Sequence, residues 1–255
     1  MTILLTNDDG VNSPGLEALS REMGSLGDVF VVAPEREKSA SSHSLTLNSL
    51  LKVRRIDDRT LSVDGTPTDC VLLAVHAVLG RRPDLLISGI NRGPNLGDDV
   101  TYSGTVGAAL EGALLSIPSV AMSLAGESNC HLATAASFCR LLVSHLSETG
   151  LPPGVLLNVN VPDLPREETR GVEITRLGRR TYADVVCEES DAEGKSCFLI
   201  RKSPPRWEDR EPGSDFRAVE AGRISITPLQ IDMTLHASIS GLKKWGRNLE
   251  LLFTA

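Results

Sequence analysis

The sequence lacks the patterns that mark several common classes of protein. Its five cysteines are scattered without a CxxC pair, which argues against a disulfide framework and favours reduced, mostly buried thiols. No apolar run approaches the roughly 18 residues that suggest a membrane-spanning helix. The first residues lack the basic, apolar and small-residue order of a secretory signal, so we expect a cytoplasmic protein that does not bind membranes.

Several nucleotide and metal motifs are missing as well. The sequence has neither the GxGxxG pattern of dinucleotide dehydrogenases nor the GxxxxGK[ST] pattern of P-loop enzymes. Its five histidines form no HxxxH or HxH pair, which argues against a zinc site built from histidine. The net charge of −7 disfavours generic binding to nucleic-acid polymers. A phosphorylated substrate would therefore need a local cation.

The sequence does contain an alternation of strand and helix patterns. Short β-branched runs predict strands that are buried on both faces, at Thr2–Thr6, Asp28–Ala33, Asp84–Ser88, Ser119–Leu124 and Val155–Val161. Apolar residues at three- and four-residue spacing predict helices between them, at Leu16–Leu26, Thr68–Leu79, Thr105–Leu115 and Leu132–Leu146. We therefore expect an α/β fold with a doubly wound, mostly parallel, Rossmann-like sheet over residues 1–165.

The pattern changes after Pro165. Residues 166–255 are typical of hairpins and extended arms, followed by a strand at Arg223–Gln230 and a terminal helix at Gly241–Leu252. Within this segment, residues 178–212 predict little beyond a variable arm. We interpret residues 166–255 as a C-terminal extension of the same unit, used either for oligomerisation or to cover an edge of the sheet.

Polar loops follow three of the expected strands. Asp8 and Asp9 come after the first strand, residues 34–44 come after the second, and the glycine-rich residues 89–104 come after Asp84–Ser88. Ligands of doubly wound sheets bind beyond the carboxyl ends of the strands. We therefore expect the three loops to meet at one edge of the sheet.

The adjacent carboxylates of Asp8 and Asp9 can serve one site only if the chain has turned, because neighbouring strand residues point to opposite faces. Gly10 permits that turn. Two close like charges favour a hard divalent cation such as Mg²⁺, Mn²⁺ or Ca²⁺. The alternative is a solvated turn in which Asp9 or Asn12 caps the next helix.

The other two loops offer further oxygen atoms and a histidine. Asn91 and Asn95 carry amide oxygens in a glycine-rich segment, and Ser39 carries a hydroxyl group. The alternatives are an asparagine that bonds only within its own turn and an exposed serine loop. His43 lies in the same loop as Ser39 and is a candidate for contact with substrate or for proton transfer.

The segment TYSGTVGAALEGAL predicts a helix that begins near Gly104. The free N–H groups and the positive end of the helix dipole favour binding of a phosphate there. Ser103 and Thr105 can donate hydroxyl hydrogen bonds to the same phosphate. A plain capping role for Ser103 is compatible with this interpretation.

Together, several strings resemble one protein family. ILLTNDDGVNSPG, VVAPEREKSASSHSLTL, GTPTDCV, LLISGINRGPNLGDDVTYSGTVGAALEG and ISITPL look like the SurE family, stationary-phase survival proteins that act as metal-dependent nucleoside monophosphate phosphatases. The resemblance implies a Rossmann-like domain with a C-terminal part that forms homodimers or homotetramers. It also implies hydrolysis of 5′- and often 3′-nucleotides, and in some members of short polyphosphates.

The resemblance also implies roles for individual residues. It implies one divalent metal ion per subunit, held by Asp8, Asp9, Ser39 and Asn91. It implies phosphate binding by Asn95, Ser103, Gly104 and Thr105. Whether Asp8 or Asp9 acts as general base or nucleophile stays open, and so does a regulator of the same fold that binds nucleotide without hydrolysing it.

Overall fold

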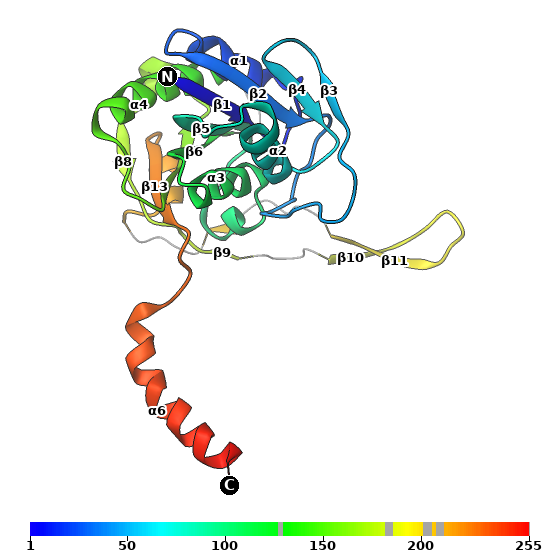
Figure 1. Cartoon of the computed structure of the whole chain (residues 1–255), viewed down its shortest axis with the longest axis vertical. Helices are drawn as coiled ribbons and strands as arrows, with labels where there is room; N and C mark the ends of the chain where they lie inside the picture. Colours follow the sequence, from blue (N-terminus) through cyan, green and yellow to red (C-terminus); the bar gives the residue numbers. More distant parts are fainter. Residues whose placement is uncertain (127–129, 182–185, 201–205, 208–211, 255) are drawn as a thin grey trace.

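A nine-stranded sheet runs through the protein, and its strand order is β3-β4-β2-β1-β5-β6-β7-β13-β8 (Figure 1). The structure is a computed structural model that describes residues 1–126, 130–181, 186–200, 206–207 and 212–254. In sheet order the strands are β3 (Val53–Arg55), β4 (Thr60–Val63), β2 (Asp28–Pro34), β1 (Thr2–Thr6), β5 (Leu85–Arg92), β6 (Ser119–Ala125), β7 (Val155–Pro162), β13 (Ile224–Gln230) and β8 (Val172–Ile174).

The strands from β4 to β7 in this order all pair in parallel. The chain runs from β1 outward to β2 and β4, then returns to β5 and proceeds outward on the other side through β6 and β7. The direction of winding therefore reverses between β1 and β5, which is the position where open α/β sheets bind ligands. The prediction of a Rossmann-like, mostly parallel sheet is confirmed.

Helices cover both faces of the sheet. They are α1 (Pro14–Met23), α2 (Pro67–Leu73) with a π-helical continuation at Ala74–Val78, α3 (Gly104–Leu114) and α4 (Leu132–Thr149). Helix α1 packs beside α4, and α2 packs beside α3. Ile3 and Leu5 of β1 belong to one apolar core, whereas Leu4 belongs to another. This alternation explains why the strand is apolar at consecutive positions.

Some boundaries differ from those predicted. Strands β3 and β4 were not expected. Strand β3 has the sequence VRR and is exposed along its length. Strand β5 continues past the expected end at Ser88 to Arg92, with an irregularity in its pairing to β6 between Ser88 and Asn91. Asn91 therefore lies in the last part of a strand. Tertiary pairing has extended the strand into a glycine-containing sequence that favours a loop.

The C-terminal extension contributes to the main sheet. Strand β13 pairs antiparallel with β7, and β8 pairs in parallel with β13. The short helix α5 (Asp215–Glu220) packs against β13 and β7. Single 3-10 turns occur at Gly97–Thr101 (η2) and Arg166–Glu168 (η3). The extension thus covers the β7 edge of the parallel sheet, which is one of the two roles expected for it.

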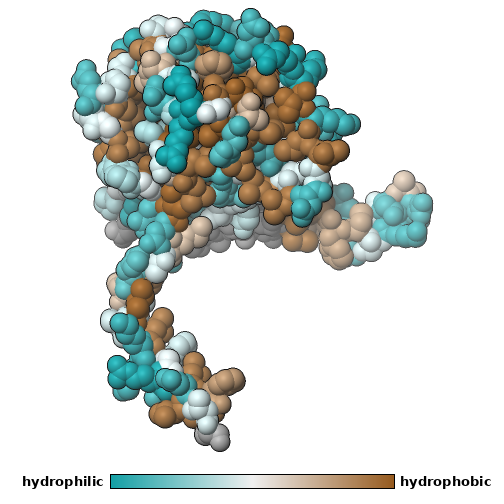
Figure 2. Space-filling view, viewed as in Figure 1, coloured by the Kyte–Doolittle hydropathy of each residue, from teal (hydrophilic) through white to brown (hydrophobic). Residues whose placement is uncertain are grey.

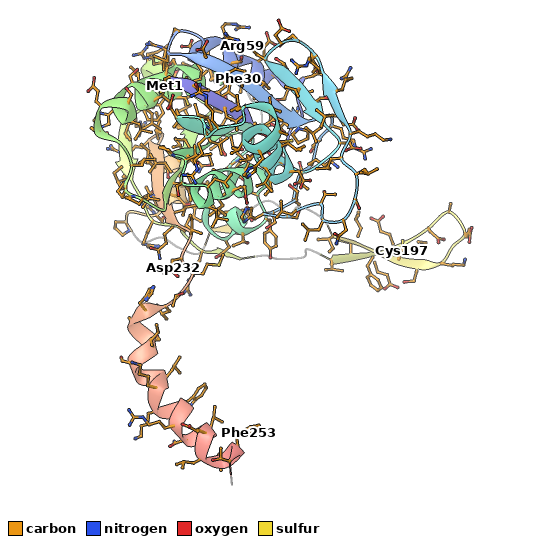
Figure 3. The ribbon with its side chains drawn as sticks, viewed as in Figure 1. Met1, Phe30, Arg59, Cys197, Asp232 and Phe253 are labelled. Atoms are coloured by element: carbon orange, nitrogen blue, oxygen red, sulfur yellow. The ribbon has the colours of Figure 1, made fainter. Side chains whose placement is uncertain are left out.

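Two parts of the extension project from the body. Strands β10 (Val186–Ser190) and β11 (Ser196–Ile200) form a hairpin that carries Cys197 away from the sheet (Figure 3). Helix α6 (His236–Phe253) begins before the predicted Gly241 and extends away from the body, with apolar side chains exposed along it (Figures 1 and 2). Strands β9 (Arg180–Thr181) and β12 (Arg206–Trp207) pair with each other. The rest of the expected arm lies outside the described residues.

The cysteines are less buried than the sequence suggested. Cys70 and Cys139 are buried, but Cys187 is half-buried, and Cys130 and Cys197 are exposed. The expectation of mostly buried thiols is therefore wrong, since hairpin β10–β11 leaves Cys197 exposed and Cys187 only half-buried. In the described part of the chain, no two cysteines form a disulfide. None of the helices in that part has the length and apolar composition that crossing a membrane requires.

Candidate functional site

The turn after β1 is organised by the buried side chain of Asn7. Its Nδ2 donates to the carbonyl oxygen of Gly10 at 3.0 Å and to Ser13 Oγ at 2.6 Å, and its Oδ1 accepts from the Gly10 N–H at 3.2 Å. Gly10 has φ +103°, which glycine adopts readily. Ser13 caps α1, so the alternative caps, Asp9 and Asn12, are not used. The carboxylates of the turn are therefore left for other contacts.

Asp8 is buried, with 5% of its surface exposed. Its Oδ1 accepts a hydrogen bond of 2.5 Å from the Thr105 hydroxyl group of α3. Gly104 lies close by, since a Cβ atom there would stand 3.0 Å from the Asp8 Cβ. Burial raises the pKa of Asp8 to about 6, and the charge of Asp9 adds to this rise. Asp8 thus carries a poorly compensated negative charge, which a cation would stabilise.

Asp9 points to a different neighbour. Its Oδ2 accepts from the backbone N–H of Arg92 at 3.1 Å, and its Oδ1 lies 3.7 Å from Arg92 Nε. Burial raises the pKa of Asp9, while these contacts with Arg92 oppose the rise. The carboxyl end of β5 therefore holds Asp9 in place beside Asp8, as the convergence of loops predicted.

A small pocket of about 180 Å³ lies where these loops meet. It is lined by residues from all three loops, namely Asp8, Ser39, Ala40, Asn91, Arg92, Pro94, Asn95, Asp99, Tyr102 and Ser103. Five of the predicted site residues thus share one pocket: Asp8, Ser39, Asn91, Asn95 and Ser103.

Two uncharged oxygen ligands predicted from the sequence lie at this pocket. Asn91 Nδ2 donates to the Gly93 carbonyl oxygen at 2.9 Å, so the amide nitrogen is engaged and Oδ1 is the end that suits a cation. Ser39 is exposed, and its hydroxyl group donates to Glu37 Oε1 at 2.6 Å, which leaves the oxygen lone pairs as acceptors. Both orientations suit oxygen coordination.

Asn95 is held by a buried polar network from two neighbouring strands. Its Nδ2 donates to Ser123 Oγ at 2.8 Å, and its N–H donates to Asn160 Oδ1 at 2.9 Å. The side-chain amides of Asn158 and Asn160 both donate to the Asn95 carbonyl oxygen, at 2.8 and 3.0 Å. Side chains of β6 and β7 therefore fix this loop. Asn158 and Asn160 were missed because NVNV resembles an ordinary buried strand.

Helix α3 begins at the pocket. Ser103 is its N-cap, and the Ser103 hydroxyl oxygen accepts from the Val106 N–H at 3.1 Å. Because Ser103 also lines the pocket, capping and anion binding by this helix start are compatible. Thr105 is fully buried behind Asp8 and donates to it. Thr105 therefore contacts the Asp8 carboxylate, whereas Ser103 lines the pocket.

His43 is not one of the described residues that line this pocket. Its Nε2 lies 2.8 Å from Glu111 Oε2, two turns further along α3 than the helix start. The loop passes close to the helix there, since a Cβ atom at Gly107 would stand 2.4 Å from the Ser42 carbonyl oxygen. The structure therefore places His43 in a contact between its loop and α3.

Arg92 and Tyr102 line the pocket and were not singled out from the sequence. The side chain of Arg92 is 53% exposed and brings a positive charge to the pocket. Tyr102 is 58% exposed and precedes the helix cap. Both could have been found from position, because an arginine in GINRG and an aromatic residue before SGT stand within the expected loop.

The donor set suits a hard divalent cation. Two carboxylates, one amide oxygen and one hydroxyl group are oxygen ligands of the kind that Mg²⁺, Mn²⁺ and Ca²⁺ bind. The part of the chain that the structure describes contains no cluster of three or more histidine, cysteine or acidic side chains arranged for a metal. A metal at this pocket would therefore depend on Asn91 and Ser39 in addition to Asp8, which lines the pocket, and Asp9, which is not among its described lining residues.

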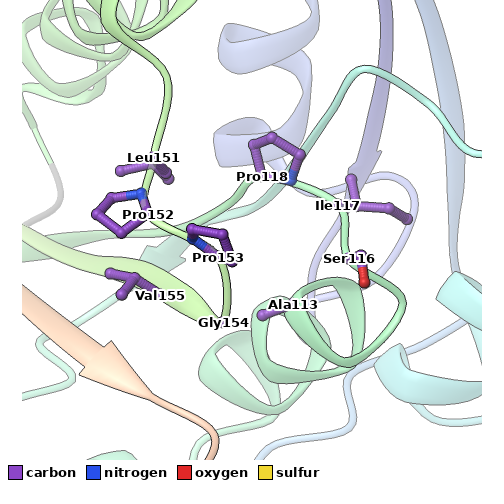
Figure 4. Close-up of a pocket in the computed structure, with 9 residues that line it drawn as sticks. All are labelled: Ala113, Ser116, Ile117, Pro118, Leu151, Pro152, Pro153, Gly154 and Val155. Atoms are coloured by element: carbon purple, nitrogen blue, oxygen red, sulfur yellow. The ribbon is translucent and has the colours of Figure 1, made fainter.

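A second hollow, of about 240 Å³, lies at the opposite end of the sheet (Figure 4). It is lined mostly by proline and aliphatic residues before β6 and β7, including Ile117, Pro118, Pro152 and Pro153. Among the described residues that line it, Ser116 alone carries a polar side chain and none is an acid or a base, so this hollow is a poor candidate for catalysis. The pocket at the carboxyl ends of the strands is the candidate active site.

A parallel α/β fold with an acidic, glycine-rich site at its switch point defines a recognisable class, and comparison with known proteins identifies the family. The family model described as "Survival protein SurE" matches residues 3–184. The chain belongs to the SurE family.

Relatives match over nearly the whole chain. The 5′-nucleotidase SurE of Geotalea uraniireducens is 50% identical over 246 residues, covering 96% of this chain and 99% of its own. The 5′-nucleotidase SurE of Coxiella burnetii is 45% identical over 251 residues, covering 98% and 97%. The crystal structure of the SurE protein from Aquifex aeolicus superposes with a TM-score of 0.87 at 43% identity, covering 96% of this chain and 100% of that one.

Proposed function

We propose that this protein is a divalent-metal-dependent phosphatase that hydrolyses nucleoside 5′-monophosphates to nucleoside and inorganic phosphate. We extend the proposal to 3′-monophosphates and short polyphosphate. The observation that carries it is the pocket in which buried Asp8 faces the start of α3, beside Asn91 and Asn95. The names of the relatives, 5′-nucleotidase SurE, support the nucleotide as substrate.

Asp8, Asp9, Ser39 and Asn91 would hold the metal ion. A divalent ion there would supply positive charge for the phosphoryl oxygens and lower the pKa of a bound water molecule. Asp8 is the residue for which this charge matters most, because burial leaves its carboxylate poorly solvated. Thr105 orients that carboxylate through its hydroxyl hydrogen bond.

The phosphate group of the substrate would lie between Asn95 and the start of α3. Backbone N–H groups at Gly104 and the dipole of the helix favour an anion, and Ser103 contributes its hydroxyl group. The guanidinium group of Arg92 adds a positive charge at the pocket. Preorganised donors of this kind stabilise the charge that develops on the transferred phosphoryl group.

Asp8 and Asp9 are not equally suited to act as general base. Without a metal ion, burial raises the pKa of Asp8 to about 6, and a bound divalent ion would lower this pKa again. Asp9 is tied to Arg92 by two contacts. We therefore propose that an Asp8 oxygen that the metal ion does not engage accepts the proton, since Asp8 has no hydrogen bond or ion pair with an arginine among the described residues. Direct nucleophilic attack by Asp8 is the alternative for the same residue.

The nucleoside would extend from the pocket toward Tyr102. This ring is largely exposed and lines the pocket, so one face is available for stacking on a base. Stacking tolerates every base, because each has an aromatic face. This contact therefore suits an enzyme that accepts several nucleotides.

We also propose that the protein forms a homodimer or homotetramer through its C-terminal extension. Helix α6 buries none of its residues, all of which are described. Its exposed apolar side chains recur at helical spacing, at Ile239, Leu242, Trp245, Leu249 and Leu252. An amphipathic helix with an uncovered apolar face requires a partner surface.

The test is an assay of inorganic phosphate release. The protein is stripped with a chelator and then supplied separately with Mg²⁺, Mn²⁺ or Ca²⁺, with nucleoside 5′- and 3′-monophosphates as substrates. We expect release only when a metal ion is returned, and none from the variant Asp8→Asn. Nucleotide binding without phosphate release, for every metal, would refute the proposal and favour a regulator that binds nucleotide.

A further inference from the structure

Asp215 is a fully buried carboxylate in the C-terminal extension. It is the first residue of α5, and 0% of its surface is exposed. Buried aspartates that do not take part in a reaction need strong compensation, because an unpaired charge in the interior is very unfavourable. The hydrogen bonds that Asp215 accepts therefore indicate its structural role.

Both carboxylate oxygens of Asp215 accept backbone N–H groups. Oδ2 accepts from Gly97 at 2.7 Å. Oδ1 accepts from Gly178 at 2.9 Å and from Phe216 at 3.0 Å. Burial raises the pKa of Asp215, and the N–H donors oppose this rise. Asp215 therefore joins the loop at Gly97 to a segment that lies far along the chain.

Gly97 is enclosed as well as bonded. Its φ of +52° lies in the left-handed region. A Cβ atom at this position would stand 2.6 Å from the Gly178 carbonyl oxygen and 2.7 Å from Phe216 Cζ. The backbone at Gly97 is thus held by the hydrogen bond to the Asp215 carboxylate and is enclosed by the buried ring of Phe216.

Gly97 lies in the loop between two residues of the candidate active site. On its amino side is Asn95, which lines the pocket, and on its carboxyl side the turn η2 leads to Ser103 and the start of α3. The polar network of β6 and β7 fixes the loop at Asn95, and Ser42 holds its far end, since Ser42 Oγ donates to the Thr101 carbonyl oxygen at 2.6 Å. Gly97 is fixed by the C-terminal extension and lies between these two attachments, on the segment that joins Asn95 to Ser103.

We infer that Asp215 is a positioning residue of the candidate active site, through which the C-terminal extension sets the distance between Asn95 and Ser103. The inference rests on the proposed function for the identity of the ligand. The clamp on Gly97 itself is independent of that function. A displacement of about 1 Å in a positioning group can lower the rate by about a hundredfold.

The variant Asp215→Asn separates the two attachments. An amide has one acceptor oxygen, and Oδ1 already serves two N–H groups, whereas Oδ2 serves only Gly97. The amide therefore places its oxygen at the Oδ1 position and turns its NH₂ group toward the Gly97 N–H, where no hydrogen bond forms. The variant releases Gly97 and leaves Gly178 and Phe216 bonded.

The first measurement is amide hydrogen exchange of a peptide that spans residues 93–103, in the full-length protein. We expect this peptide to lose protection in Asp215→Asn. The second is inhibition by inorganic phosphate, together with kcat and KM for a nucleoside monophosphate. We expect the inhibition constant for phosphate to rise about tenfold or more and kcat/KM to fall by about ten- to a hundredfold.

Ile224→Ala is the control, because Ile224 is a buried residue of β13 in the same extension. It should lower the melting temperature without altering exchange in residues 93–103 or the phosphate constant. If Asp215→Asn does not fold, Phe216→Leu tests the other side of the clamp and should change the same two readouts. Wild-type exchange and phosphate inhibition in the folded variants would overturn the inference. Wild-type protein that shows protection of the loop but no phosphate release would instead refute only the proposed function.

Discussion

The substitution Asp8→Asn should remove activity and, in the absence of metal, make the protein more stable at neutral pH. Burial raises the pKa of Asp8 from 3.8 to about 6, a difference of about 2 units. The folded state therefore binds this proton more tightly than the unfolded state does. Stability falls as the pH rises from about 4 to about 6, because the folded protein must hold a buried charge.

The magnitude follows from the shift. One pKa unit corresponds to about 1.4 kcal/mol, so holding Asp8 ionised costs up to about 3 kcal/mol above pH 6. Asparagine removes the charge and keeps an oxygen that accepts the Thr105 hydroxyl hydrogen bond. We therefore expect the metal-free variant to exceed the wild type by up to about 3 kcal/mol at pH 7.5 and to match it near pH 4.

Urea unfolding followed by circular dichroism, in the presence of a chelator, measures this difference at pH 4, 5.5 and 7.5. Addition of Mg²⁺ should then stabilise the wild type and leave Asp8→Asn unchanged, since ligand binding stabilises only the protein that binds. The matched control is Asp9→Asn, which should gain less because Arg92 already compensates Asp9. A variant Asp8→Asn that is less stable than the wild type at every pH would refute the reasoning.

Three further predictions concern other parts of the molecule. The substitution Tyr102→Ala should raise KM for nucleotides about tenfold with little change in kcat, and should leave KM for glycerol phosphate unaltered, because only a base can stack on the ring. His43→Ala should lower the unfolding free energy by about 1 kcal/mol and leave the pH–rate profile unchanged, since His43 contacts Glu111; a shifted profile would show a role in proton transfer. Deletion of residues 236–255 should reduce the mass measured by light scattering while β13 stays in the sheet, and an unchanged mass would exclude α6 from the interface.

The fold was predictable where the sequence pattern is repeated and local. The strands at Thr2–Thr6 and Ser119–Ala125 are continuous apolar runs, and burial on both faces of a parallel sheet requires that composition. Strand β3 was missed because its VRR sequence is polar and its structure depends on pairing with β4. Strand β5 was ended too early because the irregular pairing after Ser88 is decided by its neighbour β6.

The site was predictable to a similar extent. Asp8, Ser39, Asn91, Asn95 and Ser103 were selected because each follows a predicted strand or begins a predicted helix, and the carboxyl ends of parallel strands lie at one edge. Which way each side chain turns was not predictable. The roles of Thr105, which donates to Asp8, and of His43, which contacts Glu111, depend on how the loops pack against α3.

The sequence by itself determined the alternation of the main parallel strands with helices, the acidic turn after β1 and the family to which the chain belongs, because these depend on residue type and short spacing. Only the tertiary structure decided that Asp215 reaches Gly97, that Asn160 holds Asn95 and that Arg92 binds Asp9. These contacts join residues as many as 118 positions apart. A charge or amide acquires such a role only from the groups that folding brings beside it, and no local pattern records those groups.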